Sequence, residues 1–169
     1  MVATATLDFQ QRAWAGLGLV PDPEIPMVSI VELGMVLSVS ALSLESCEVV
    51  LLPTFSGCPA LDSIESEVRK ALVGEGFVAP EVRFNLTHPY TSDRITASGR
   101  AKLKAWGIAP PMQKAESELY DDLDFLENTP CPRCNSTDTV FNSTFGPALC
   151  RATHYCNACQ EAFQSFKPL

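Results

Sequence analysis

The chain has 169 residues, of which 46% are hydrophobic, enough for one ordinary domain or for a domain of about 100 residues and a small module. Its formal net charge of −8 argues against nonspecific binding to nucleic acid and against binding to an anionic membrane surface. No apolar run reaches the length of about 18 residues that a membrane span needs. The first residues lack the pattern of a secretory signal, so we expect a reducing cytoplasm, where paired cysteines are more often metal ligands than disulfides.

The first 109 residues predict a small α/β sandwich with the element order α-β-β-α-β-α. Helical spacing predicts helices at residues 1–19, from residue 59 to Gly74 or Gly76, and at residues 92–106. Alternating apolar and polar side chains predict a sheet of three strands, at residues 35–42, 47–52 and 81–86. An acidic linker, residues 110–128, is expected to lead to a second domain, residues 129–169.

A proline-rich segment, residues 20–26, follows the first predicted helix. Its prolines oppose both helix formation and strand pairing, so we expect a rigid extended loop. This loop carries Asp22 and Glu24. The two carboxylates could bind a metal or accept hydrogen bonds from a neighbouring loop, and isolated carboxylates of this kind are more often structural.

The stretch from residue 51 to residue 72 predicts a buried strand, a tight loop and an amphipathic helix, with Cys58 at the joint. Pro59 suits the first helical position, because its missing N–H is not needed there. Cys58 is then expected at the N-cap, where the helix dipole and free N–H groups favour the thiolate and lower the pKa. Such a thiolate could attack an electrophile or bind a soft metal, whereas the plain alternative is a small capping residue.

The second domain contains two Cys-x-x-Cys pairs, Cys131 with Cys134 and Cys156 with Cys159. Two such pairs on facing hairpins place four sulfurs in the tetrahedral arrangement that zinc prefers. A closed four-sulfur site has no open position, so the predicted role is structural, and iron could occupy a site of the same geometry. Because a module of about 40 residues cannot fold on its own core, we expect the metal to be required for folding.

The remaining features of this domain concern its core and its odd cysteine. Five aromatic residues are expected to form a small core: Phe141, Phe145, Tyr155, Phe163 and Phe166. Cys150 could be a buried filler, a replacement ligand or a fifth thiol for transient metal binding. In the first domain, Cys47 is expected in the core and His88 in a loop.

Two sequence patterns resemble known families. Residues 22–36, DPEIPMVSIVELGMV, and residues 54–62, TFSGCPALD, resemble the MIP18/DUF59 family of iron–sulfur assembly factors. The continuation TSDRITASGRAKLKAWGIAPP at residues 91–111, together with the four-cysteine tail, resembles the PaaD family, the D components of bacterial phenylacetyl-CoA epoxidase systems. The resemblance covers nearly the whole chain, and Asn135 stands where a glycine would be more usual after the first cysteine pair.

The resemblance implies an accessory role in phenylacetate catabolism, in which the protein helps to insert or repair an iron–sulfur cluster in a partner. The expected client is the reductase component of the epoxidase. Cys58 would be a transient ligand for iron or a cluster, or a reactive thiol, supported by the loop residues Asp22, Glu24 and Thr54. One thiolate cannot hold a cluster, so further ligands would come from a homodimer partner, the client or a small thiol.

Other functions remain open at this point. The chain could be a scaffold component of the epoxidase complex, or a thiol enzyme that uses Cys58 as nucleophile. The oxygen chemistry itself is not expected here, because the sequence has neither the Glu-x-x-His pattern of a di-iron centre nor a glycine-rich dinucleotide motif. The acidity of the chain favours protein partners over nucleic acid.

Overall fold

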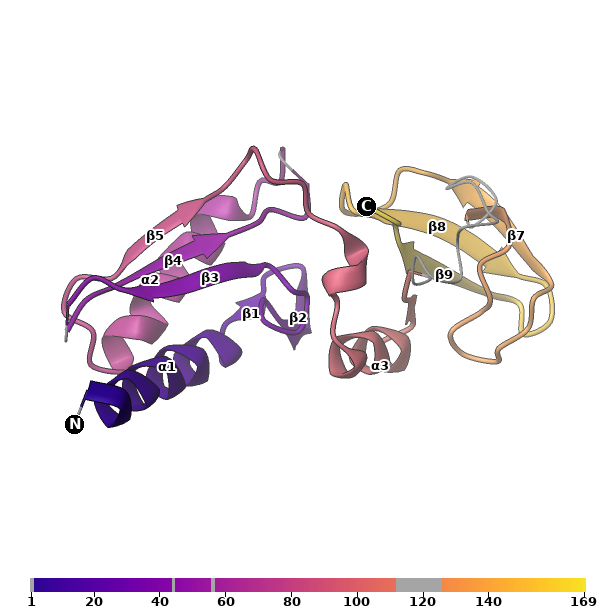
Figure 1. The fold of residues 1–169 in the computed structure, drawn as a ribbon. Helices are drawn as coiled ribbons and strands as arrows, with labels where there is room; N and C mark the ends of the chain where they lie inside the picture. Colours follow the sequence, from indigo (N-terminus) through magenta and orange to yellow (C-terminus); the bar gives the residue numbers. More distant parts are fainter. Residues whose placement is uncertain (1, 44, 56, 112–125) are drawn as a thin grey trace. The chain divides into compact units, whose positions relative to one another are not determined.

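The computed structural model describes residues 2–43, 45–55, 57–111 and 126–169, with side chains from residue 9 onward. Its contacts divide the chain into two compact units, Met1–Tyr90 and Thr91–Leu169, which Figure 1 draws in indigo to magenta and in pink to yellow. This division falls earlier than the domain boundary expected at residue 109, and most of the expected linker, residues 112–125, lies outside the described residues. None of the described helices combines the length and hydropathy of a membrane span.

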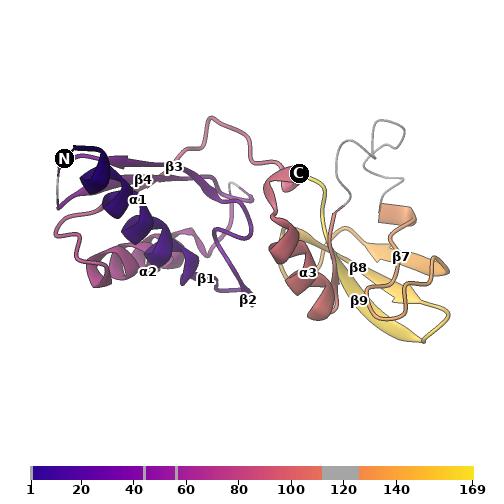
Figure 2. The same cartoon turned by 60° about the horizontal axis from the view of Figure 1, so that its bottom comes forward.

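The N-terminal unit is a two-layer arrangement of helices on a sheet. Its elements are α1 (Val2–Gly18), β1 (Pro21–Asp22), β2 (Ile25–Ser29), β3 (Val36–Ala41), β4 (Cys47–Leu51), α2 (Leu61–Gly74) and β5 (Glu81–Phe84). The main sheet has the order β3-β4-β5, with β3 antiparallel and β5 parallel to β4. Helices α1 and α2 pack on each other and contact β3 and β5 respectively, so together they cover one face of the sheet (Figures 1 and 2). The α/β class and the three-stranded sheet are therefore confirmed.

The core of this unit follows the predicted apolar positions. Helix α2 buries Ile64, Val68 and Leu72, which recur at helical spacing. Strand β4 is buried along most of its length, and Cys47 at its start is fully buried, as expected for a core residue. Gly16 of α1 lies so close to α2 that a Cβ there would approach the Ala71 carbonyl oxygen to 3.3 Å.

Arg12 links the two helices in a way that the sequence pattern does not reveal. Its Nε and Nη2 atoms donate to the carbonyl oxygen of Glu75, at 3.0 and 2.7 Å. Its guanidinium also lies 4.8 Å from the ring centre of Phe77. The positive charge therefore sits at the C-terminal end of α2, where free carbonyl groups favour a cation.

The proline-rich loop forms a hairpin, so the expectation that it takes no part in strand pairing is wrong. Strands β1 and β2 pair antiparallel, with Pro21 opposite Ser29 and Asp22 opposite Ile25. Proline lacks an N–H but keeps its carbonyl acceptor, and a two-stranded sheet has only edge strands, where proline is tolerated. The Oδ1 atom of Asp22 accepts the N–H groups of Glu24 and Ile25, both at 2.9 Å, and closes the turn.

Helix α2 begins two residues later than predicted. Its N-cap is Ala60, and Pro59 lies in the preceding turn. The N–H of Leu61 faces the carbonyl oxygen of Cys58 at 3.5 Å, rather than its sulfur. Cys58 is therefore not the N-cap residue, and the prediction that the helix N-terminus lowers its pKa loses its geometric basis.

The C-terminal unit is a four-stranded sheet with a short helix. Its elements are η1 (Ser92–Arg94), α3 (Ala97–Ala105), β6 (Ile108–Ala109), β7 (Thr139–Ser143), β8 (Arg151–Cys156) and β9 (Glu161–Phe166). The strand order is β6-β9-β8-β7, with β6 parallel to β9 and the other pairs antiparallel (Figure 1). The predicted ribbon strands are present, and a strand from before the expected linker extends their sheet.

The segment around α3 belongs with the ribbon by its hydrogen bonds. Strand β6 pairs with β9, and the N–H of Ser92 donates to the carbonyl oxygen of Leu169 at 3.0 Å. The single helix expected at residues 92–106 is instead η1 followed by α3, because the Thr96 hydroxyl accepts the N–H of Gly99 at 3.0 Å and caps a new helix there. The structure thus places α3 and β6 in the second unit rather than in the first domain.

The core of the ribbon differs from the predicted aromatic cluster. Phe163 and Phe166 are buried as expected and Phe141 is partly buried. The predictions for Phe145 and Tyr155 are wrong, because their side chains are 78% and 37% exposed. Tyr155 lies between two buried residues of β8, so the alternation of the strand turns it outward.

His154 is part of the ribbon core, which the sequence predicted to be built from five aromatic side chains. It is fully buried, its ring stacks on Phe163 at 5.0 Å, and its Nε2 atom lies 2.8 Å from the Ser165 hydroxyl. Burial lowers its pKa to about 4, so the imidazole is neutral at physiological pH. A histidine inside an apolar strand carries no sequence signal that separates this packing role from a chemical one.

The apolar face of α2 gives a direct test of the N-terminal core. Leu72→Ala should lower the free energy of unfolding of the first unit by about 2–5 kcal/mol, because Leu72 is fully buried. Denaturant unfolding followed by Trp14 fluorescence, in a Trp106→Phe background, measures it. Val73→Ala is the matched control, because Val73 is 54% exposed and should change stability by less than about 0.5 kcal/mol. Equal effects of the two substitutions on stability would contradict the assignment of Leu72 to the buried face of α2.

Candidate functional site

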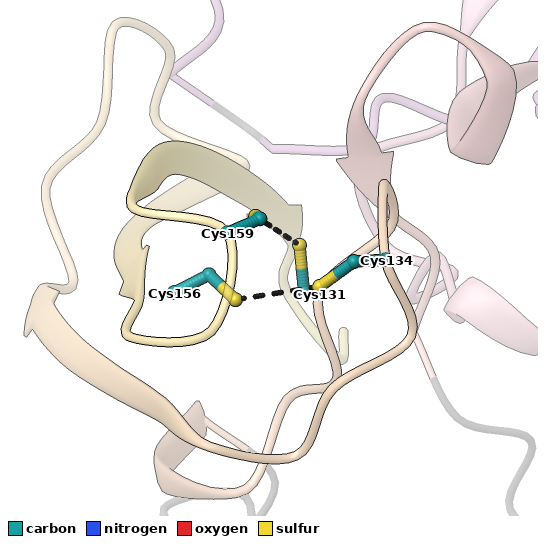
Figure 3. Close-up of side chains that lie close together, drawn as sticks. All are labelled: Cys131, Cys134, Cys156 and Cys159. Atoms are coloured by element: carbon teal, nitrogen blue, oxygen red, sulfur yellow. Dashed lines mark hydrogen bonds between the residues drawn. The ribbon is translucent and has the colours of Figure 1, made fainter.

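Four cysteine side chains converge between the start of the ribbon and the β8–β9 turn (Figure 3). Cys131 and Cys134 come from the turn before β7, Cys156 ends β8, and Cys159 lies in the turn that follows. Their sulfur atoms all lie within 4.8 Å of one another. The structure therefore brings together the four residues that the paired spacing predicted.

The two cysteine pairs have the same backbone form. The N–H of Asn135 donates to the carbonyl oxygen of Cys131, and the N–H of Gln160 donates to that of Cys156, both at 2.9 Å. Asn135 and Gln160 each have a φ of 60°, the left-handed conformation that favours glycine. Asparagine adopts this conformation more readily than most residues, which explains how Asn135 replaces the expected glycine.

The donor set and its spacing fit a tetrahedral metal ion. A zinc ion with Zn–S bonds of about 2.3 Å places its sulfurs about 3.8 Å apart. Here the sulfur of Cys131 lies 3.7 Å from that of Cys159, and the sulfur of Cys134 lies 3.5 Å from that of Cys156. Four cysteines would hold zinc or iron as thiolates, and with all four positions filled by protein the metal would stabilise the fold rather than bind substrate.

The backbone favours the thiolate at Cys156, whereas burial raises the pKa of Cys159. The N–H of Cys159 is the main reason that the pKa of Cys156 falls to about 7. Cys150 is buried at the start of β8, whereas Cys156 is at the end of that strand. Cys150 is not among the four grouped sulfurs, so this arrangement does not use it as a replacement ligand.

A second cluster of functional side chains lies in the N-terminal unit, where the β1–β2 hairpin approaches the loop before α2. The carboxylates of Glu24 and Asp22 both act electrostatically on the Cys58 thiol, although the sequence separates them by more than thirty residues. Cys58 is half-buried, and its N–H donates to the carbonyl oxygen of Phe55 at 3.0 Å. The structure therefore places the two loop carboxylates within electrostatic range of Cys58, although the described residues Asp22, Glu24 and Cys58 do not form a metal-ligand group.

The environment of Cys58 raises its pKa, contrary to the predicted lowering. Burial is the largest cause, because it disfavours the charged thiolate, and the negative charges of Glu24 and Asp22 act in the same direction. The N–H of Ala60 opposes this effect. The reason for the wrong prediction is twofold: the helix starts after Ala60, and the carboxylates could not be placed beside Cys58 from sequence alone.

Two other residues named from the sequence occupy less telling positions. Thr54 is half-buried in the loop between β4 and Cys58. His88 is exposed, and its N–H donates to Asn85 Oδ1 at 3.0 Å, in agreement with a loop role. Nothing in its described contacts gives it a chemical function.

The comparison with known proteins separates the same two parts of the chain. Residues 10–79 match the family model described as "Iron-sulfur cluster assembly protein", and residues 121–167 match "PaaD zinc beta ribbon domain". Among solved structures, a DUF59 domain from Bacillus anthracis is 32% identical, with a TM-score of 0.52, and covers 56% of this chain and 91% of that domain. A Mycobacterium tuberculosis protein described as associated with Fe–S complex assembly and repair is 29% identical, with a TM-score of 0.35, over 60% of this chain and 88% of its own.

The fold and the four-cysteine group thus define a protein with a DUF59-type α/β domain and a metal-binding ribbon. The chain is also 36% identical to an Escherichia coli (strain K12) protein named as the putative D component of 1,2-phenylacetyl-CoA epoxidase. The match extends over 155 residues, which are 91% of this chain and 90% of that protein. The chain therefore belongs to the PaaD family.

The four-cysteine group predicts a strict metal requirement. Cys134→Ala should abolish stoichiometric metal binding and unfold the ribbon, while the N-terminal unit stays folded. Metal analysis by mass spectrometry and circular dichroism measure the two effects. Cys150→Ala is the control, since it removes a thiol outside the group and should leave the metal in place. Full metal content in Cys134→Ala would contradict the four-ligand assignment.

The left-handed residue after the second cysteine pair predicts a stabilising substitution. Gln160→Gly should raise the free energy of unfolding of the ribbon by about 0.5 kcal/mol. The substitution removes backbone strain of about 1–2 kcal/mol, and the larger conformational entropy of glycine in the unfolded chain offsets part of that gain. Gln160→Ala should change stability little, because alanine carries the same strain. Thermal unfolding of the zinc-loaded protein measures both, and a less stable Gln160→Gly would count against this origin of the strain.

Proposed function

We propose that this chain is an accessory protein of a phenylacetyl-CoA epoxidase system that assists iron–sulfur cluster assembly or maturation, with the reductase component as its client. The observation that carries this proposal is the electrostatic influence of Asp22 and Glu24 on the half-buried Cys58 thiol. The family relationship and the match to an iron–sulfur assembly model support the same conclusion. The chain itself would not carry out the epoxidation.

The charges around Cys58 favour a cationic cargo over a free thiolate. Two carboxylates beside a sulfur make its ionisation costly as long as no positive charge is present. An iron ion, or a cluster iron, would reverse this balance, because its positive charge would offset the two negative charges that disfavour the thiolate. The loop therefore suits the capture of iron better than it suits a nucleophile that must be ionised before it reacts.

The site would hold its cargo only weakly. Iron–sulfur clusters usually take four protein ligands, and Cys58 supplies one sulfur. The missing ligands would come from the client, a second copy of the chain or a small thiol. Incomplete ligation suits a protein that must release its cargo, whereas the complete four-cysteine group suits a metal that stays, which we propose to be a structural zinc.

A thiol enzyme is the weaker alternative because of the raised pKa of Cys58. A reactive cysteine is normally recognised by a lowered pKa, produced by a nearby cation or a helix N-terminus. Cys58 has anions beside it, and the start of α2 lies beyond it. The iron and sulfide content of the reductase distinguishes a pure scaffold role from the maturation role.

The maturation role predicts cluster content in the client. Cells that produce the epoxidase components without this chain should yield reductase with less than about one fifth of its iron and acid-labile sulfide. Wild-type chain should restore both, and Cys58→Ser should not. The serine hydroxyl is nearly the same size as the cysteine thiol but is a poor ligand for iron. Cys150→Ala should restore them as wild type does. Reductase that is fully loaded in the absence of the chain would exclude the maturation role and favour a scaffold.

The carboxylates predict opposite effects on thiol reactivity and on function. Glu24→Gln should lower the pKa of Cys58, because it removes a negative charge that now raises it. Alkylation of Cys58 by iodoacetamide, followed across pH by peptide mass spectrometry, should then reach its midpoint at lower pH. The same variant should restore less iron to the reductase than wild type. Increased activity together with increased reactivity would support the thiol enzyme instead, and Glu67→Gln, an exposed residue paired with Lys70, is the control.

A further inference from the structure

A small basic pocket lies in the C-terminal unit, next to the first cysteine pair. It has a volume of about 250 Å3. Its lining residues are Lys104, Ala105, Trp106, Gly107, Pro132 and Arg133. Two of them are cations, and Trp106 is 55% exposed, so the pocket combines positive charge with an open aromatic face.

The backbone on both sides of the pocket is well fixed. Helix α3 ends there, and Gly107, with a φ of 86°, donates its N–H to the carbonyl oxygen of Lys104 at 3.0 Å. The positive φ of Gly107 closes the helix, and the guanidinium of Arg133 lies at van der Waals distance, 3.6 Å, from where a Cβ of this residue would be. Arg133 itself lies between two of the grouped cysteines, Cys131 and Cys134.

The two cations are available for a partner. In the described parts of the chain, neither Lys104 nor Arg133 forms an ion pair with a carboxylate, and both side chains are exposed. They also stand out in a chain whose net charge is −8. A basic site on an otherwise acidic protein can attract a negatively charged segment without attracting nucleic acid to the rest of the surface.

We propose that this pocket docks an acidic segment of a partner protein. A carboxylate would lie between Lys104 and Arg133, whose planar guanidinium can bind both carboxylate oxygens, and a neighbouring apolar or planar side chain would rest on Trp106. Tryptophan and arginine are the residues that most often dominate protein interfaces. The pocket is smaller than the cavities of about 300–1,000 Å3 that hold cofactors, so it suits one or two side chains rather than a whole cofactor.

The four-cysteine group would control this docking site. Arg133 lies in the turn between Cys131 and Cys134, which a bound metal would hold in place. Loss of the metal would therefore remove the arginine from the pocket, while Lys104 and Trp106 stay at the end of α3. The ribbon would in this way couple metal occupancy to partner binding.

Co-expression with the epoxidase components tests the docking proposal. The choice of these components as candidate partners rests on the proposed function. Tagged full-length chain should capture a component at least tenfold less well when it carries Lys104→Glu with Trp106→Ala. The single change Arg133→Glu should act in the same direction. The control is Phe145→Ala with Lys167→Glu, an aromatic–cation pair 5.8 Å apart near the start of β8 and the end of β9, at the opposite end of β8 from Cys156. Bound zinc is measured in every variant.

A zero-length carbodiimide cross-link tests the chemistry of the contact. It should join the Lys104 amine to a glutamate or aspartate of the captured component, in a segment identified by mass spectrometry. Unchanged capture by Lys104→Glu with Trp106→Ala, an equal loss in the control, or no capture by wild type would overturn the proposal. The cluster content of the reductase is measured in the same cells. If the chain captures no component but still restores the reductase cluster, the docking proposal fails and the proposed function stands. If the chain captures a component but does not change the cluster content, the proposed function fails and the docking proposal stands.

A small anion is the other occupant to be tested. Inorganic phosphate is titrated into Trp14→Phe chain, in which Trp106 is the remaining tryptophan. We expect no saturable change in Trp106 fluorescence below about 10 mM phosphate. Saturation at micromolar phosphate that also blocks capture would assign the pocket to a free anion and overturn the docking proposal.

Discussion

Four cysteine sulfurs that lie within 4.8 Å of one another cannot all be ionised unless a cation neutralises them. This constraint shapes the whole C-terminal unit, because Cys131 and Cys156 pack with Ala109 of β6 and Phe163 of β9 in one buried cluster. A metal held by the four sulfurs would therefore lie at the edge of this core, because Cys131 and Cys156 are buried and Cys134 is exposed. The same cluster joins β6 to this unit, because Ala109 packs against Cys131, Cys156 and Phe163.

The four-cysteine group and Cys58 differ in how their surroundings affect the thiolate and in how many sulfur ligands they offer. In the ribbon, the N–H of Cys159 stabilises the thiolate of Cys156, and four sulfurs would complete the coordination of a metal and retain it. At Cys58, burial and two carboxylates disfavour thiolate, and a single sulfur leaves the coordination of any iron incomplete. The first arrangement suits a permanent structural metal. We propose that the second suits a cargo that arrives with positive charge and leaves again.

The sequence predicts the local elements well and their junctions poorly. Helical spacing identified the buried face of α2, and the paired cysteines identified the metal group, because both signals are periodic or local. The start of α2 was misplaced because Pro59 fits either a first helical position or the turn before it. The pairing of β6 with β9, the buried His154 and the approach of Glu24 to Cys58 depend on contacts between distant residues, for which this single sequence has no signal. The wrong direction for the pKa of Cys58 follows mainly from its burial, to which Glu24 and Asp22 add, and from the later start of α2.

Cluster transfer between purified proteins tests the central claim of a releasable cargo at Cys58. The chain is loaded with iron and sulfide without oxygen and mixed with apo-reductase in the presence of an iron chelator, and the recovery of reductase absorbance is followed. Wild type should restore the reductase despite the chelator, and Cys58→Ser with its zinc in place should not. Recovery at the same rate with Cys58→Ser, or complete suppression of wild-type transfer by the chelator, would contradict the account.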